Sequence, residues 1–382
     1  MSMKAVIAID SFKGSLSSAE AGEAVKAGIL AAVSDADVEV IPVADGGEGT
    51  TEALTYGMGG RLQTVRVTGP LGEQVDACYG IVGGTAAVME MSAAAGLTLI
   101  PKDERDPLRT TTFGVGEMTR DAVEKGIRHF IVGIGGSATN DGGAGMLQAL
   151  GYDLLDRDGG PIKPGARGLS ELAVIKTDNV MPELKECTFR VACDVTNPLC
   201  GERGASAVFG PQKGASPEDV RRMDGWLSRY AEIASEVIPD ADPDHPGSGA
   251  AGGLGFAFRT FLGATLESGI KIVLDETGME DHIREADVVV TGEGRLDAQT
   301  VMGKAPAGVA ELAKKYGKPV IAFSGSVSPD ARICNEHGID AYFPIIRDII
   351  SLDEAMEPER ARRNLTAASE QVFRLWGRSR EL

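Results

Sequence analysis

The 382-residue sequence predicts an α/β protein whose parallel sheet is built from both ends of the chain. Apolar strand-like runs alternate with helical periodicity near the start of the chain and again from Ile270 onward. Between these parts, from about Leu62, apolar and polar residues alternate as they do in antiparallel hairpins. The chain is also longer than one hydrophobic core usually serves, so two domains are expected.

The N-terminal part predicts one β-α-β unit. The strand-like runs "KAVIAID" and "VEVIPVAD" end in Asp10 and Asp45. The apolar spacing over 19–33 predicts the helix that connects them, with Ser17 or Ser18 as its N-cap. A short helix over 50–56 is expected next.

The middle and C-terminal parts of the chain show two further patterns. After the hairpins, helices are expected over 114–125, 143–150 and 217–237, with strands at "HFIVGIGG" and "TFRVACDV". From Ile270 the predicted strands are "IKIVLD", "ADVVVTGEG", "KPVIAFSGS" and "DAYFPII", before a final helix over 359–376. Pairing the first strands with the last makes the middle an inserted domain. We therefore expect residues 1–62 and 266–382 to form one domain and residues 63–265 the other.

Composition and charge exclude several classes of protein. A net charge of −18 argues against a nucleic-acid partner, because phosphate backbones require a basic face. No apolar run approaches the roughly 20 residues of a membrane-spanning helix, and the N-terminus lacks a signal-peptide pattern. A cytoplasmic protein that does not bind membranes is expected. Five cysteines without a C-x-x-C pair indicate reduced thiols and no zinc site. Nothing indicates an oligomeric state.

Fifty glycines gather in clusters that mostly follow strand-like runs. Loops at the carboxyl ends of parallel strands converge on one crevice, where α/β proteins bind their ligands. The chain has neither a Walker loop nor a G-x-G-x-x-G after the first strand. Its loops "GEGRLD" and "GAAGGLG" suit either phosphate contact through backbone N–H groups or plain tight turns.

Acidic residues beside these loops are a stronger signal than the glycines. An aspartate at a strand end often only caps the next helix, which explains some of them. If several converge, a divalent cation or Lys and Arg must offset their repulsion, and phosphoryl transfer uses this combination of groups. A metal-dependent aldolase or lyase also uses carboxylates and a lysine. The acids are Asp10, Asp45, Glu48, Asp141, Asp194, Glu293 and Asp297, and the nearby bases are Lys13, Lys213, Arg295 and Lys304.

Eight collinear stretches resemble the type I glycerate kinases over nearly the full chain. They are "IDSFKGSLSSAEA", "PVADGGEGT", "GIGGSATNDGGAGMLQALG", "CDVTNPLCG", "FGPQKGAS", "GAAGGLGF", "TGEGRLDAQTVMGKAP" and "PVIAFSGS". The resemblance implies a Rossmann-like domain from both chain ends, an inserted mixed α/β domain and a cleft between them. It also implies ATP, Mg²⁺ and D-glycerate, with 2-phosphoglycerate as the product.

Within that resemblance we interpret Asp194 as the base for the glycerate hydroxyl, although an Asx-turn aspartate would look the same. Lys13 and Arg295 suit the carboxylate of glycerate or the transferring phosphoryl group, or else pair with a neighbouring aspartate. The expected substrate-binding set is Asp10, Ser11, Lys13, Asp45 and Arg295. The expected nucleotide set is Lys304, Gly252, Gly253, Gly292 and Gly294. The pool for Mg²⁺ is Asp45, Glu48, Asp141, Glu293 and Asp297, of which only one or two would be ligands.

Two other functions stay open from the sequence. One is a kinase that makes 3-phosphoglycerate or acts on another small hydroxy acid. The other is a non-catalytic sensor that closes over a small hydroxy acid, although a sensor does not require the carboxylates beside the glycine loops.

Overall fold

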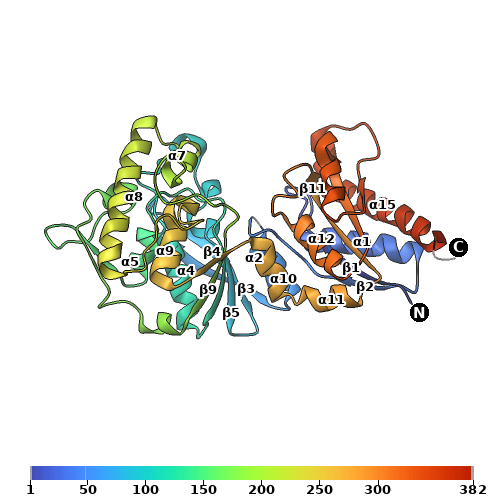
Figure 1. Ribbon diagram of the computed structural model, residues 1–382, viewed down its shortest axis with the longest axis horizontal. Helices are drawn as coiled ribbons and strands as arrows, with labels where there is room; N and C mark the ends of the chain where they lie inside the picture. Colours follow the sequence, from blue (N-terminus) through green and yellow to red (C-terminus); the bar gives the residue numbers. More distant parts are fainter. Residues whose placement is uncertain (1, 48, 380–382) are drawn as a thin grey trace. The chain divides into compact units, whose positions relative to one another are not determined.

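The computed structural model describes residues 2–47 and 49–379, and the chain divides into two compact units. Unit 1 comprises Met1–Asp45, Glu52–Met58 and Ile270–Leu382, and unit 2 comprises Gly46–Thr51 and Gly59–Gly269. The fold is the expected mixed α/β arrangement (Figure 1). The predicted domain bounds and the cleft between the domains stay predictions.

Unit 1 contains a five-stranded parallel sheet made from both ends of the chain. Its order is β13-β12-β11-β1-β2, so the strand order reverses between β1 and β11. In such sheets ligands bind outside the carboxyl ends of the strands at the point of reversal. The strands are β1 (Lys4–Ile9), β2 (Asp37–Val40), β11 (Val288–Leu296), β12 (Val320–Val327) and β13 (Ala341–Pro344).

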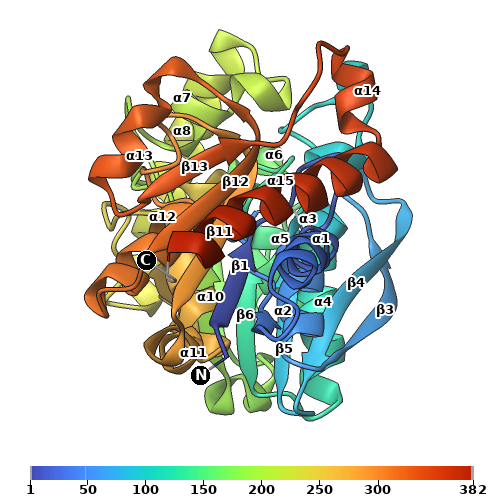
Figure 2. The same cartoon turned by 90° about the vertical axis from the view of Figure 1, so that its right-hand side faces the viewer.

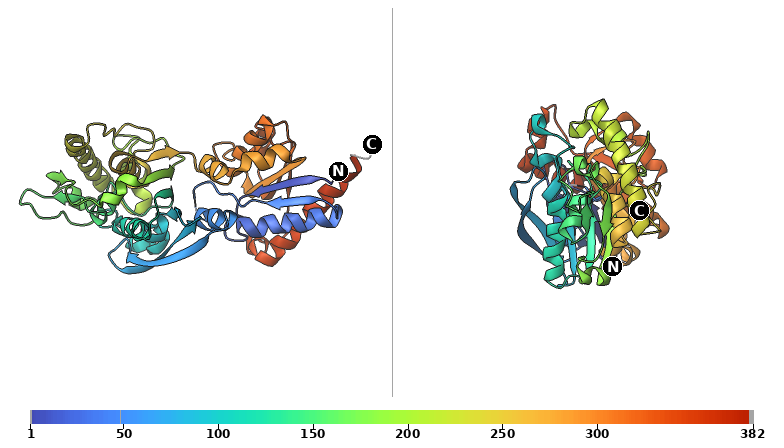
Figure 3. Two further views of the ribbon diagram at one scale, coloured as in Figure 1. Left: turned by 90° about the horizontal axis from the view of Figure 1, so that it is seen from below. Right: turned by 90° about the vertical axis from the view of Figure 1, so that its left-hand side faces the viewer.

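Two long helices cover one face of this sheet, α1 (Ser18–Ala32) and α15 (Pro358–Ser379), and they lie side by side in Figures 2 and 3. The N-cap of α1 is Ser17, one of the two predicted candidates, and its side chain forms a capping box with Glu20. The two helices approach closely because Gly28 has no side chain: a Cβ there would lie 2.0 Å from the Ser369 hydroxyl. The remaining helices of unit 1 are α2 (Thr50–Gly57), α10 (Gly269–Glu276), α11 (Met279–Glu285), α12 (Ala305–Lys315), α13 (Ile333–Glu336) and α14 (Leu352–Met356).

Unit 2 contains a mixed six-stranded sheet of order β10-β9-β6-β5-β4-β3. The strands from β10 to β5 are parallel, and β5, β4 and β3 form the antiparallel meander that the sequence predicted. Its core includes Phe130 and Phe189, whose rings stack with centroids 4.7 Å apart. The strands are β3 (Arg61–Thr68), β4 (Gln74–Val82), β5 (Ala86–Glu90), β6 (His129–Gly133), β9 (Thr188–Ala192) and β10 (Thr265–Glu267).

Helices and one small hairpin complete unit 2. The helix expected over 217–237 is α8 (Pro217–Val237), opened by a Ser216 capping box. The others are α3 (Ser92–Ala95), α4 (Phe113–Glu124), α5 (Ala144–Ala149), α6 (Ala166–Leu169), α7 (Ala205–Phe209) and α9 (Leu254–Leu262), and the hairpin pairs β7 (Asp153–Leu155) with β8 (Val174–Lys176). None of the helices in the described ranges is both long and apolar enough to cross a bilayer.

Three local predictions were wrong. The strand expected over "VEVIPVAD" is shorter, because β2 ends at Val40 and Asp45 lies in the following loop. The run "IKIVLD" is helix α10 rather than a strand, because Ile270 and Val273 bury one helical face, with Ile270 close to Gly308 of α12. The stretch "GEGRL" is not a turn but the end of β11. It stays in the sheet because Glu293 and Arg295 pair in register with β12.

Candidate active site

A cavity of about 420 Å³ lies in unit 1 at the carboxyl ends of the strands. The end of β11 and residues that follow β1, β2 and β13 contribute to its wall, at the edge where the strand order reverses. Nine residues that the sequence singled out line it: Asp10, Ser11, Lys13, Asp45, Glu293, Gly294, Arg295, Asp297 and Lys304. The structure therefore brings together acids and bases from distant parts of the chain.

Asp10 follows β1 and is only 5% exposed. Its N–H donates to the Gly292 carbonyl of β11 at 2.9 Å, and the Ser11 N–H donates to its carboxylate at 2.6 Å. Burial and the nearby negative charge of Asp45 raise the pKa of Asp10 to about 7. A cation in the cavity would therefore stabilise the charged form of Asp10.

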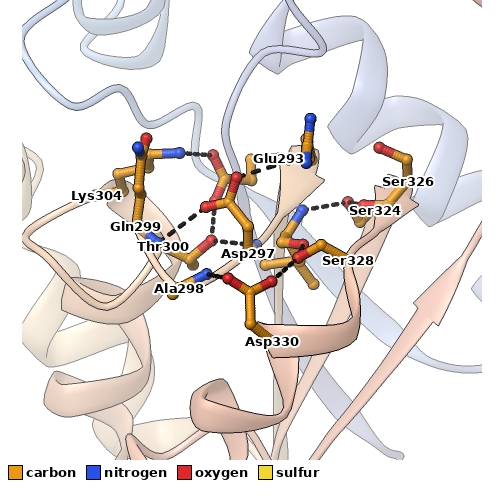
Figure 4. A network of polar contacts seen from close by, with 12 residues as sticks. Glu293, Asp297, Ala298, Gln299, Thr300, Lys304, Ser324, Ser326, Ser328 and Asp330 are labelled. Carbon is orange, nitrogen blue, oxygen red and sulfur yellow. Dashed lines mark hydrogen bonds and ion pairs between the residues drawn. The ribbon is translucent and has the colours of Figure 1, made fainter.

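Glu293 is held from two sides by the turn after β11 (Figure 4). The Thr300 hydroxyl donates to one carboxylate oxygen at 2.6 Å, and the Lys304 ammonium lies 3.3 Å from the other. Burial raises the pKa of Glu293, and these two partners act against that shift. Lys304 occupies the N-cap position of α12, but its side chain makes no cap hydrogen bond and its ammonium contacts Glu293 instead.

Asp297 belongs to the same turn (Figure 4), and the neighbouring Arg295 also lines the cavity. The Gln299 N–H donates to the Asp297 carboxylate at 2.9 Å, while the Arg295 guanidinium lies 3.5 Å from the other carboxylate oxygen. The Arg295 side chain is 67% exposed, so it remains available to an anion in the cavity.

The two glycines of β11 differ in their surroundings. A Cβ on Gly292 would lie 1.9 Å from the Phe323 carbonyl oxygen, so close strand packing by itself requires glycine there. At Gly294 the nearest heavy atom, the Phe12 Cα, would be 3.6 Å away, which is ordinary contact. The fold leaves room for a side chain at Gly294, and that side chain would stand in the cavity wall.

Asp194 lies in unit 2, exposed, just beyond the end of β9. One of its carboxylate oxygens accepts a hydrogen bond from the Gly269 N–H at 3.2 Å. The side chain is accessible to a substrate, and its catalytic role stays a prediction.

Asp141 in unit 2 is fully buried and fixes the loop before α5. Its carboxylate accepts hydrogen bonds from the Thr112 N–H and hydroxyl at 2.8 and 2.9 Å, and from the N–H groups of Gly143 and Gly145. Burial raises its pKa, and these donors act against that shift. Because its oxygens are engaged by protein donors, we leave Asp141 out of the proposed metal ligands. Glu48 lies outside the described residues.

Gly252 and Gly253 are buried against the loop of residues 139–142 in unit 2. A Cβ on Gly252 would lie 2.0 Å from the Thr139 carbonyl oxygen, and one on Gly253 would lie 2.8 Å from the Gly142 Cα. Loop packing is enough to explain both glycines, and their contact with a nucleotide stays a prediction.

Lys213 is the base that sequence analysis could not place. It is 1% exposed in unit 2, and its ammonium donates to the Ser137 hydroxyl at 2.7 Å and to the Thr139 carbonyl at 2.6 Å. Burial lowers the pKa of Lys213 to about 7, although the charge of Asp141 acts against the shift. It supports the loop after β6.

Sequence analysis missed several residues of the unit 1 site. Thr300 could have been found from its D-x-x-T spacing to Asp297, which is typical of a turn closed by side chains. Ser15, Asn364 and the apolar residues of 345–361 line the cavity without a motif that marks them. They come from helices and loops that only the tertiary fold brings to the sheet edge.

The donor set of the cavity suits Mg²⁺, although no preformed cage is present. Within the described residues, no group of three or more His, Cys, Asp or Glu side chains is arranged to hold a metal ion. Mg²⁺ usually takes only one or two carboxylates and completes its shell with waters and phosphate oxygens. Asp10 and Asp45 both line the cavity, and the negative charge of Asp45 contributes to the raised pKa of Asp10.

A cavity of mixed charge lies at the reversal point of a parallel sheet, which is the place where proteins of this α/β class bind small ligands. Comparison with known proteins narrows this class. The model of the glycerate kinase family matches residues 5–377. The glycerate 2-kinase of Escherichia coli K12 is 50% identical over 96% of this chain and 97% of its own length, and the glycerate kinase of Bacillus subtilis 168 is 49% identical over the same shares.

A solved structure agrees with these sequence matches. A crystal structure from Salmonella typhimurium LT2, provisionally assigned as glycerate kinase 2, superposes with a TM-score of 0.93 at 47% identity, with both chains covered completely. The chain belongs to the glycerate kinase family, as its sequence motifs predicted.

Proposed function

We propose that the protein transfers the terminal phosphoryl group of ATP to D-glycerate in the cytoplasm and releases 2-phosphoglycerate. The observation that carries the proposal is the convergence of three bases, Lys13, Arg295 and Lys304, with four carboxylates on one cavity of unit 1. Phosphoryl transfer depends chiefly on positioning and on charge stabilisation, which this mixture of groups supplies.

The proposed roles follow from charge and exposure. Lys13 and Arg295, both exposed, would bind the glycerate carboxylate or the transferring phosphoryl group, together with Ser11 and Asp10. Lys304 would contact the nucleotide phosphates from the start of α12. Asp45, Glu293 and Asp297 form the pool that would hold Mg²⁺. When bound, Mg²⁺ neutralises charge on the phosphate oxygens.

Asp194 is proposed as the base that accepts the proton of the glycerate hydroxyl. Because the side chain is exposed, and an amide oxygen accepts the same hydrogen bond from the Gly269 N–H, we expect the loop to tolerate replacement of the carboxylate by an amide. We expect Asp194→Asn to lower kcat by about 10² to 10⁴-fold with an unchanged melting temperature. Near-normal turnover of this folded variant would rule out the role.

A coupled assay of ADP release tests the function itself. D-glycerate, L-glycerate, hydroxypyruvate and tartronate are offered with ATP and Mg²⁺, and D-glycerate is expected to have the highest kcat/KM. ³¹P NMR of the product then distinguishes 2-phosphoglycerate from 3-phosphoglycerate. Binding of D-glycerate without ADP release under any condition would instead favour a non-catalytic sensor.

A further inference from the structure

The cavity of unit 1 has an apolar half that the proposed phosphoryl chemistry does not use. Its wall comes from the segment 345–361 and includes Ile345, Ile346, Leu352 and Met356. Glycerate and a phosphate chain are polar throughout, so neither gains from contact with this wall. The apolar half requires a ligand with an apolar surface.

The apolar wall is formed in advance and partly exposed. Leu352 is 75% exposed and Ile346 37%, although both line the cavity. Helix α14, which carries Leu352 and Met356, is fixed at its start by a Ser351 capping box. The Met356 methyl reaches the loop after β1, where a Cβ on Gly14 would lie 2.9 Å from it. A flat ligand would remove these side chains from water without rearranging the wall.

Two uncommitted polar groups border the same cavity. Asn364 of α15 lines it, and its carboxamide has no hydrogen-bond partner in the ranges 2–47 and 49–379. The buried Ser15 hydroxyl also lines the cavity without a partner among those residues. A carboxamide presents a donor and an acceptor side by side, which matches the donor and acceptor on an edge of adenine. A few placed polar groups in an apolar pocket are typical of sites that fix a ring's orientation.

We propose that the apolar half binds the base of a purine nucleoside triphosphate, with the ring against Leu352 and Met356 and the Asn364 carboxamide paired with an edge of adenine. The inference rests on the proposed function and adds the residues by which the protein prefers one nucleotide base over another. The triphosphate would continue into the polar half, toward Lys304.

Calorimetry tests the proposal with ATP, GTP and tripolyphosphate, which lacks a base. The wild-type protein should bind ATP more tightly than GTP and tripolyphosphate. Asn364→Ala should weaken ATP binding about tenfold and remove the preference over GTP, because one neutral hydrogen-bonded pair is lost. Leu352→Ser should weaken ATP and GTP alike. Arg363→Ala, an exposed neighbour on the same helix, is the control and should bind all three ligands as the wild type does.

Unchanged tripolyphosphate binding in both variants shows that the fold and the polar half are intact. The proposal is overturned if tripolyphosphate binds the wild type as tightly as ATP, or if the two folded variants keep wild-type affinity for ATP. If ATP binding follows the expected pattern while glycerate is not phosphorylated, the base site is supported and the proposed function fails.

Discussion

At the scale of single residues, Gly292 and Gly294 show that two nearby glycines of one motif have different roles. Gly292 lets β11 approach the Phe323 carbonyl of β12, which is a requirement of the sheet. Gly294 has space around it and borders the cavity, so its missing side chain leaves room for a ligand. Gly292 is therefore needed for the stability of the sheet, whereas we expect Gly294 to be needed for ligand binding.

Alanine is expected to affect stability at Gly292 and activity at Gly294. Gly292→Ala should lower the free energy of unfolding by about 3 kcal/mol, because the new methyl group overlaps a backbone oxygen. Gly294→Ala should change it by no more than about 0.5 kcal/mol, but should lower kcat/KM about tenfold by narrowing the cavity. Urea unfolding measures the free energy of unfolding of each variant, and the ADP-release assay measures its kcat/KM. Full activity of Gly294→Ala would show that no ligand approaches this wall.

At the scale of elements, the most accurate predictions from sequence were those of helices that have both a capping residue and a regular apolar periodicity. Helix α8 matches its predicted bounds because a capping box and a long amphipathic pattern agree. Short apolar runs are ambiguous: the β-branched residues of "IKIVLD" suggest a strand, but burial of Ile270 and Val273 makes the helix α10.

The polar half of the site was predictable because its charged residues follow strands, and parallel strands place their carboxyl ends at one edge. The apolar half was not, because Asn364 and Leu352 belong to helices whose sequences give no sign of which face meets a cavity. Likewise, the burial of Asp141 and Lys213 depends on loops that meet only in the folded chain.

The loop after β6 gives a prediction about pH. Burial lowers the pKa of Lys213 to about 7 from its ordinary 10.5. Between these values the unfolded chain binds more protons than the folded chain, so this lysine makes the free energy of unfolding rise with pH in that window. Below about pH 7 the lysine is charged in both states, and its contribution no longer changes with pH.

Lys213→Met should therefore remove part of the rise in stability between pH 7 and pH 9. The advantage of the wild type over the variant in urea unfolding should grow steadily across this range. Lys102→Met, at an exposed position of the same unit, is the control and should leave the pH profile parallel to that of the wild type. A parallel profile for Lys213→Met as well would show that Lys213 titrates alike in both states.

At the scale of the whole molecule, the two cores use different parts of the chain. The core of unit 2 takes its buried residues from one continuous stretch, Val67 to Ala264. The core of unit 1 combines residues 3–38 with residues 288–373, so neither end of the chain can complete it alone. This arrangement supports the proposal that the middle of the chain is an inserted domain.

The expected consequence is that residues 59–269 fold as a separate fragment, whereas residues 1–58 do not. The longer fragment keeps every buried residue of its core and loses the hydrogen bond from the Thr51 N–H to Glu90 and the packing of Gly46 against Ala192. The shorter one keeps β1, β2 and α1 but exposes the apolar surface that β11 and α15 cover. Circular dichroism should show a cooperative thermal transition for 59–269 alone. If that fragment melts without cooperativity, unit 2 depends on the rest of the chain and is not an independent domain.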